Sequence, residues 1–180
     1  FIRKTYLHLG GAVLAFVVVA AALIKSPLAP KMMNMLSASP YSWFIVLGAF
    51  MFVGHIANKW AMSGGSVGKQ YLGLGLYVVA QAILFVPLLF IAANYSDPNV
   101  IPTAGLMTGI VFGGLTATVF ITKKDFSFLG KALMLAMFGA MGLIVVSMIF
   151  GFTLGTLFAA AMVVVAGGYV LYYTSNVLHK

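Results

Sequence analysis

From Phe152 to Tyr173 the chain carries no charged side chain. An α-helix of about 20 apolar residues is long enough to cross the hydrocarbon core of a bilayer. Glycine and alanine recur along this stretch, which is typical of a helix that packs closely against other helices in a membrane. The stretch therefore predicts a transmembrane helix inside a bundle, followed by a short polar cluster.

The rest of the chain has the same character, because 63% of all residues are hydrophobic and only 7% are charged. The mean hydropathy is +1.11. A water-soluble domain of this size cannot bury so much apolar surface, so the sequence predicts an all-α polytopic membrane protein. The net charge of +8 would suggest nucleic-acid binding in a soluble protein. Here the basic residues lie between apolar runs, which favours the lipid bilayer as their partner and no nucleic acid.

Six apolar runs predict six transmembrane helices in a single domain over residues 1–180. The expected spans are about 6–24, 41–57, 71–93, 101–121, 129–150 and 152–173. The loop from Lys25 to Pro40 contains several prolines, and within it residues 31–36 could form a short segment at the membrane interface.

Lysine and arginine are distributed unevenly between the two ends of these spans. With the N-terminus in the cytoplasm, only Lys25 and Lys31 lie on the far side. The cytoplasmic side then holds Arg3, Lys4, Lys59, Lys69, Lys123, Lys124, Lys131 and Lys180. Cytoplasmic loops carry an excess of basic residues, so we expect a cytoplasmic N-terminus.

Helix packing is also indicated by the sequence. Gly105, Gly109 and Gly113 recur every four residues, so they share one helix face and predict close approach of another helix. Methionines at helical spacing in residues 134–148 could suggest a soft metal, but without cysteine or a nearby histidine they favour adaptable packing, and no metal site is expected.

Enzymatic chemistry is not expected. The chain has no cysteine and no glutamate, and its two acids, Asp97 and Asp125, lie in predicted loops. Catalysis by a nucleophile or by acid and base needs such groups to converge, and no phosphate-binding or dinucleotide motif is present. We therefore predict neither an enzyme nor a bound cofactor.

A path for ions would normally contain charged residues inside the spans, and none lies in the middle of a span. The polar substitutes are Gln81, His55 and three residues of the last span, Tyr169, Tyr173 and Asn176. The last three are spaced i, i+4 and i+7, so they share one face. These five residues are our candidates for an ion pathway. The alternative is that they hydrogen-bond between helices and hold the bundle together.

Four stretches carry a family resemblance along nearly the whole chain. They are residues 1–8, FIRKTYLH; residues 73–89, from GLGLY to PLL; residues 122–130, TKKDFSFLG; and residues 168–176, GYVLYYTSN. In these stretches the sequence resembles the Bax-inhibitor-like (TMBIM) family, in its bacterial YccA-like branch. The resemblance implies a multi-pass protein of the bacterial inner membrane, with six helices around a seventh, C-terminal one. It also implies a pH-sensitive calcium leak gated by two aspartates, with calcium as the permeant ion.

The sequence departs from this family pattern. Tyr173 occupies the position of the aspartate on the sixth helix, and Gln81 stands where glutamate is common. A tyrosine hydroxyl is uncharged at neutral pH and is a poor ligand for calcium. The seventh helix, which carries the second aspartate, is also missing, and we expect the native protein to continue beyond Lys180, because close packing forbids a central void.

Two functions remain open at this point. The first is an ion leak channel of the family type without the di-aspartyl switch. The second is a non-conducting interaction subunit, or a modulator of another membrane complex such as a protease. The glycine face at 105–113 and the lost acids favour the second, and the overall resemblance favours the first.

Overall fold

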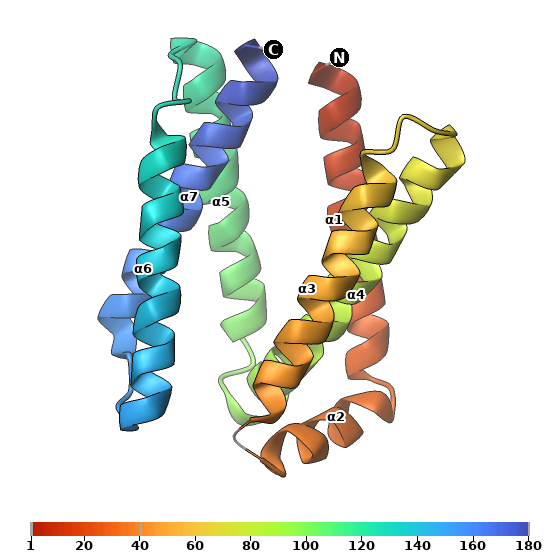
Figure 1. Ribbon diagram of the computed structural model, residues 1–180, viewed down its shortest axis with the longest axis vertical. Coiled ribbons are helices and arrows are strands. Elements are labelled where there is room, and N and C mark those ends of the chain that lie inside the picture. The colour runs from red at the N-terminus through yellow and green to blue at the C-terminus, as the bar shows by residue number, and fades with distance from the viewer. Residues whose placement is uncertain (1, 40, 180) are drawn as a thin grey trace. The chain divides into compact units, whose positions relative to one another are not determined.

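The computed structural model describes residues 2–39 and 41–179, and these residues form seven helices and no strand. The helices are α1 (Ile2–Ile24), α2 (Leu28–Ser37), α3 (Ser42–Ala61), α4 (Val67–Tyr95), α5 (Val100–Thr122), α6 (Leu129–Phe150) and α7 (Gly155–His179) (Figure 1). Six of them, all except α2, are long and apolar enough to cross a membrane. Among the sequence predictions, Phe1, Pro40 and Lys180 lie outside the described residues.

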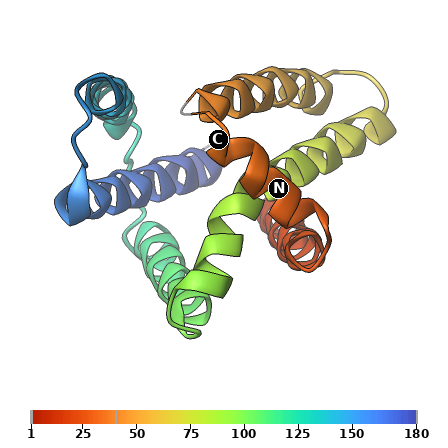
Figure 2. The same ribbon diagram turned by 90° about the horizontal axis from the view of Figure 1, so that it is seen from below.

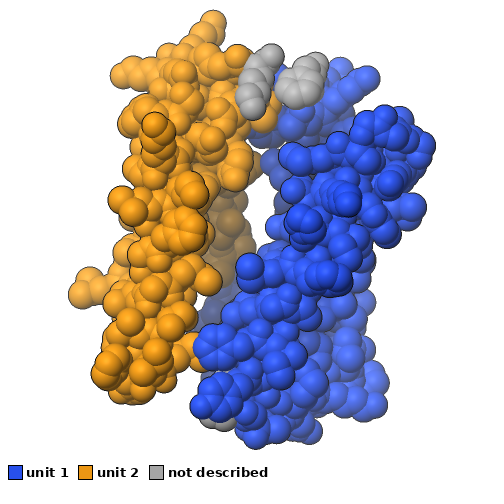
Figure 3. Space-filling view, in the orientation of Figure 1, with its two compact units in different colours: residues 1–102 blue, residues 103–180 orange. Residues whose placement is uncertain are grey.

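The chain divides into two compact units, residues 1–102 and residues 103–180, which are coloured separately in Figure 3. In unit 1, α4 packs against both α1 and α3, and Figure 2 shows it between them. The short helix α2 contacts all three and runs crosswise to them at one end of the unit (Figures 1 and 2). The core of this unit includes Val86, Ala82 and Ala57, which are almost completely buried.

Close approach between α3 and α4 depends on Gly73. A Cβ atom at this position would lie 2.6 Å from the carbonyl oxygen of Ala57 and 2.6 Å from the backbone nitrogen of Ala61. On the opposite side, α1 packs on α4 through an edge-to-face contact of Phe16 with Phe85, whose ring centroids are 5.5 Å apart. Backbone contact through a glycine is a common way for apolar helices to gain van der Waals packing in a membrane.

In unit 2, α7 packs along α6 and also meets α5. Gly168 faces Leu133, so that an added Cβ would lie 2.6 Å from the leucine Cδ2. Gly130 faces the ring of Tyr172, and Gly167 faces Leu115 of α5. The turn between α6 and α7 begins at Gly151, which has φ 71° and whose N–H bonds the Ser147 carbonyl oxygen at 2.8 Å. This left-handed conformation suits glycine and ends α6.

The six predicted spans are confirmed as helices, but some of their bounds differ. Helix α3 continues to Ala61 and α7 to His179, because polar residues at the end of an apolar run can extend the same helix. Residues 152–154, predicted as helical, lie outside α7, which begins at Gly155. The short segment expected at 31–36 is helix α2, while its position at a membrane interface stays a prediction.

We predict that Gly73→Ala weakens the packing of α3 on α4. The added methyl group would overlap backbone atoms that cannot rotate away, and overpacking of this kind typically costs about 1–3 kcal/mol. The measurement is the thermal unfolding midpoint of the purified protein in detergent. Gly75→Ala on the same helix is the matched control, because a Cβ there meets nothing within 4 Å. Equal midpoints for the two variants would contradict the prediction.

Candidate functional site

Helix α7 carries three of the five predicted pathway residues on one face. The rings of Tyr169 and Tyr173 stack with their centroids 5.8 Å apart, and Tyr173 also meets the edge of Tyr172 at 5.2 Å. Tyr173 is 61% exposed in this structure, whereas Tyr169 and Asn176 are half-buried. We call Tyr169, Tyr173 and Asn176 the tyrosine face. The structure therefore brings the two tyrosines together as their spacing predicts.

The other two predicted residues belong to unit 1. Gln81 is half-buried on α4, and His55 is exposed on α3. Because α3 continues to Ala61, His55 lies farther inside its helix than the predicted span of 41–57 implied. Their role in an ion pathway stays a prediction.

A second polar group lies where the C-terminal end of α7 meets the loop between α5 and α6. The hydroxyl of Ser175, whose side chain is fully buried, accepts a hydrogen bond from the Phe126 N–H at 2.9 Å. The same hydroxyl donates to Oδ1 of Asp125 at 3.3 Å, and that oxygen also accepts the Ser127 N–H at 2.8 Å. A single serine thus bonds two residues of the loop.

His179 completes this group, one helical turn beyond Ser175. Its Nδ1 lies 3.0 Å from the Ser175 carbonyl oxygen, and its Nε2 lies 3.2 Å from the Lys123 carbonyl oxygen. Carbonyl oxygens only accept hydrogen bonds, so an imidazolium ring is the form that can donate to both. We call Lys123, Asp125, Phe126, Ser175 and His179 the Ser175 cluster. It ties the loop to α7 through contacts that lie about 50 residues apart in the sequence.

The surroundings of Asp125 in this cluster favour its ionised form. Hydrogen bonds from the backbone and the hydroxyl of Ser127 lower the pKa of Asp125 below its ordinary value of 3.8. Partial desolvation acts in the opposite direction, while the Ser175 hydroxyl and the charge of His179 add to the lowering. The loop therefore holds a fixed negative charge beside Lys123 and Lys124 at neutral pH.

Aspartate, serine and histidine are the residue types of a hydrolytic triad, but the hydrogen bonds that join them here differ from those of a triad. In a triad the histidine takes the serine proton and the carboxylate orients the histidine. Here the Ser175 hydroxyl donates directly to Asp125, and Nδ1 of His179, 3.4 Å from this hydroxyl, lies closer to the Ser175 carbonyl oxygen at 3.0 Å. The Ser175 side chain is also fully buried, so it cannot reach a substrate. In the described part of the chain there is also no group of three histidine, cysteine or acidic residues that could hold a metal ion. The geometry of the Ser175 cluster is that of a structural contact.

Sequence reasoning missed both the Ser175 cluster and a second polar pair. In unit 1, Nε2 of His8 lies 2.6 Å from the hydroxyl oxygen of Tyr71, and the two rings are stacked. A local signal for the cluster was present, because an aspartate followed two residues later by serine is typical of a turn closed by the aspartate side chain. The partners on α7 and α4 are long-range contacts that no local pattern indicates.

Comparison with known proteins shows the family of the chain. The family described as "Inhibitor of apoptosis-promoting Bax1" matches residues 1–180. A Pseudomonas aeruginosa protein named "Uncharacterized protein PA2604" is 37% identical over 142 residues, which cover 76% of this chain and 60% of that protein. "Bax inhibitor 1" of Schizosaccharomyces pombe is 30% identical over 145 residues, which cover 78% of this chain and 52% of that protein. The chain therefore belongs to the Bax inhibitor family.

The chain spans between about half and three fifths of the length of these two curated relatives. No solved structure matches it. The family resemblance predicted from the four sequence stretches is confirmed, while the YccA-like branch stays a prediction.

We predict that Asp125→Asn loosens the loop at the Ser175 cluster at neutral pH. Because the folded pKa of Asp125 is lowered, its ionised form stabilises the cluster fully above the ordinary value of 3.8. This contribution is lost as the pH falls through the lowered value. Hydrogen exchange of the amides in residues 123–128 measures the effect. The variant should exchange several-fold faster than the native protein near pH 7, and the difference should shrink as the pH falls below 3.8.

Asp97→Asn is the matched control. Asp97 also accepts an N–H two residues later, from Asn99 at 2.8 Å, but it lies in the loop between α4 and α5. This variant should leave the exchange of residues 123–128 unchanged. If Asp125→Asn also left it unchanged at neutral pH, the Ser175 cluster would not hold the loop.

Proposed function

We propose that this member of the Bax inhibitor family is a cation leak channel in its membrane, with calcium as the permeant ion and without a di-aspartyl switch. The family membership and the six long apolar helices support the multi-pass membrane setting of this proposal. The conducting role itself is carried by the tyrosine face of α7.

The tyrosine face is the observation on which the proposal rests. It places stacked aromatic rings and an amide on one side of a helix that has no charged residue between Gly155 and Asn176. Tyr173, at the position where the family resemblance puts an acid, exposes 61% of its surface. A phenol hydroxyl can hydrogen-bond to the water shell of a passing ion, but it does not replace carboxylate ligands. Such a path would conduct hydrated cations weakly.

The two acids of the chain give no substitute for the missing carboxylate. Asp125 is engaged in the Ser175 cluster, and Asp97 lies in the loop before α5. Neither lies within a membrane-spanning helix. Gating by a shared proton between two carboxylates requires both of them at one site. A leak along the tyrosine face should therefore have no carboxylate gate between about pH 6 and 8, because its phenol groups stay neutral there.

A second candidate function, a non-conducting interaction subunit, is favoured by α5. A Cβ atom added to Gly105, Gly109 or Gly113 would meet nothing within 4 Å, and all three residues are exposed. This face is suited to close approach by another helix. No described residue of unit 2 packs against this glycine face. The helix predicted to pack on it therefore stays a prediction.

We predict calcium flux into proteoliposomes that contain the purified native protein. The flux should be similar at about pH 6 and about pH 8, because the tyrosine face carries no group that titrates there. Tyr173→Asp should increase the flux at both pH values, because a carboxylate binds calcium and a single aspartate is ionised throughout this range. Tyr173→Phe should lower the flux through loss of the hydroxyl. Tyr95→Phe, at the exposed C-terminal end of α4, is the matched control and should leave it unchanged.

Two results would overturn the proposal. Flux that changes strongly with pH in the native protein would show that its gate does not need an acid on α7. Absence of flux in the native protein, with flux in Tyr173→Asp, would show a fold without a working path and would favour the interaction subunit.

A further inference from the structure

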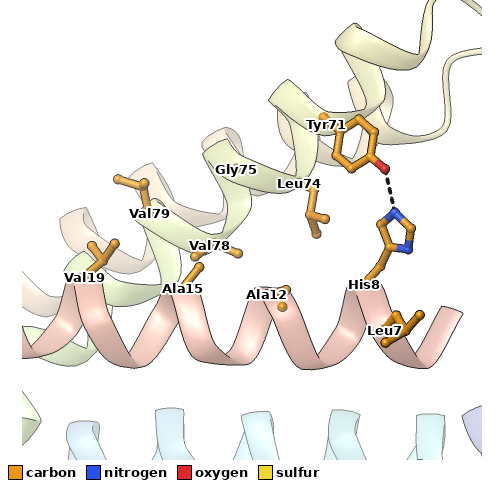
Figure 4. A pocket seen from close by; sticks show the side chains of 11 residues that line it. Leu7, His8, Ala12, Ala15, Val19, Tyr71, Leu74, Gly75, Val78 and Val79 are labelled. Atoms are coloured by element: carbon orange, nitrogen blue, oxygen red, sulfur yellow. Dashed lines mark hydrogen bonds between the residues drawn. The ribbon is translucent and has the colours of Figure 1, made fainter. Parts of the chain in front are cut away.

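Unit 1 contains an open groove between α1 and α4 with a volume of about 470 Å³. We call it the α1–α4 groove (Figure 4). The groove is open on the α1 side because the residues there are small, namely Gly11, Ala12 and Ala15. On the α4 side, Leu74 and Val78 form part of its apolar wall. All of the residues that line it belong to residues 1–102.

One end of the groove is polar and the other is apolar. His8 and Tyr71 lie at the first end and are joined by the 2.6 Å hydrogen bond drawn in Figure 4. Nδ1 of His8 lies 2.7 Å from the Lys4 carbonyl oxygen, so it donates, and Nε2 of a neutral ring accepts the Tyr71 hydroxyl. Val19 and Val79 line the opposite end. A ligand in this groove would need an apolar body and a polar head.

The charge at the polar end is positive. Lys4 is one helical turn before His8, and Lys69 is two residues before Tyr71; both are exposed. Arg3 adds a third exposed basic residue on the first turn of α1. The acid of unit 1, Asp97, follows the other end of α4. This distribution complements an anionic head group.

The length of the groove fits one leaflet of a bilayer. From Leu7 to Val19 the axis of α1 rises by roughly 18 Å at 1.5 Å per residue. One leaflet supplies about 15 Å, half of a hydrocarbon core that is about 30 Å thick. An acyl chain aligned with α1 would therefore extend from the polar end of the groove to its apolar end.

We propose that the α1–α4 groove binds one acyl chain of an anionic phospholipid. The phosphate lies at the basic end near Lys4 and Lys69, and the Tyr71 hydroxyl is the adjacent polar contact. This site does not depend on conduction and would exist in either of the two functions considered above. Its ligand comes from the surrounding bilayer.

The experiment uses a phospholipid with a photoreactive diazirine in its acyl chain. The purified protein is placed in vesicles that contain the probe with either a phosphatidylglycerol or a phosphatidylcholine head group. After illumination, mass spectrometry locates the adducts. We expect adducts on residues 7–19 and 71–79, several-fold more with the anionic probe.

Two pairs of variants test the two ends of the ligand separately. Ala15→Leu fills the groove and should reduce the adducts several-fold, whereas Ala21→Leu, on the same helix but outside the lining, should not. Lys69→Gln leaves the groove intact and should remove the preference for the anionic probe. Lys31→Gln on α2 is its control.

The proposal would be overturned by adducts spread evenly around α1 and α4. It would also be overturned by equal labelling with both head groups, or by Ala15→Leu labelling as strongly as Ala21→Leu. The unfolding midpoints of the variants are measured together with the labelling. An unchanged midpoint shows that a loss of adducts in Ala15→Leu comes from the filled groove and not from unfolding. Lys69→Gln tests the head-group contact without changing the packing.

Discussion

The absence of water inside a bilayer is the constraint on which this structure depends. Every backbone group within the hydrocarbon region must find its partner inside its own helix, so the membrane-spanning part consists of helices. The same constraint restricts both acids to loops. Lipid is as apolar as leucine, so helices gain little by hiding apolar side chains from it, and close contact must supply the attraction. Gly73 against α3 and Gly168 against Leu133 provide such contact in the two units.

At the helix ends, polar contacts also hold the helices together. His8 with Tyr71 joins α1 to α4, and Ser175 with Asp125 joins α7 to the preceding loop. Tyr173 lies only two residues before Ser175, so the Ser175 cluster also fixes the rotation of the helix that carries the tyrosine face. The structural contact and the candidate pathway are therefore coupled through α7, although only the second is proposed to meet an ion.

The sequence was sufficient for the number and order of the spans, because an uncharged run of about 20 residues has few alternatives. It was less informative about their ends: α7 continues through polar residues to His179, while Phe152 stays outside it. Tyr169 and Tyr173 could be placed on one face from their spacing alone. Ser175 and Asp125 could not be paired, because their contact bridges 50 positions and depends on how α7 packs on α6. The same holds for His8 and Tyr71, 63 positions apart.

The crosswise helix α2 determines the spatial order of unit 1. Ten residues of helix displace the chain sideways by roughly 15 Å, more than the 8–10 Å that usually separates two packed helices. The gap between α1 and α3 is filled by α4, which is synthesised last of the three. During insertion into the membrane, α1 and α3 are therefore synthesised before α4, the helix against which both of them pack. The assembly of this unit is completed by its final helix, and a chain interrupted before Val67 would leave two unpaired helices in the lipid.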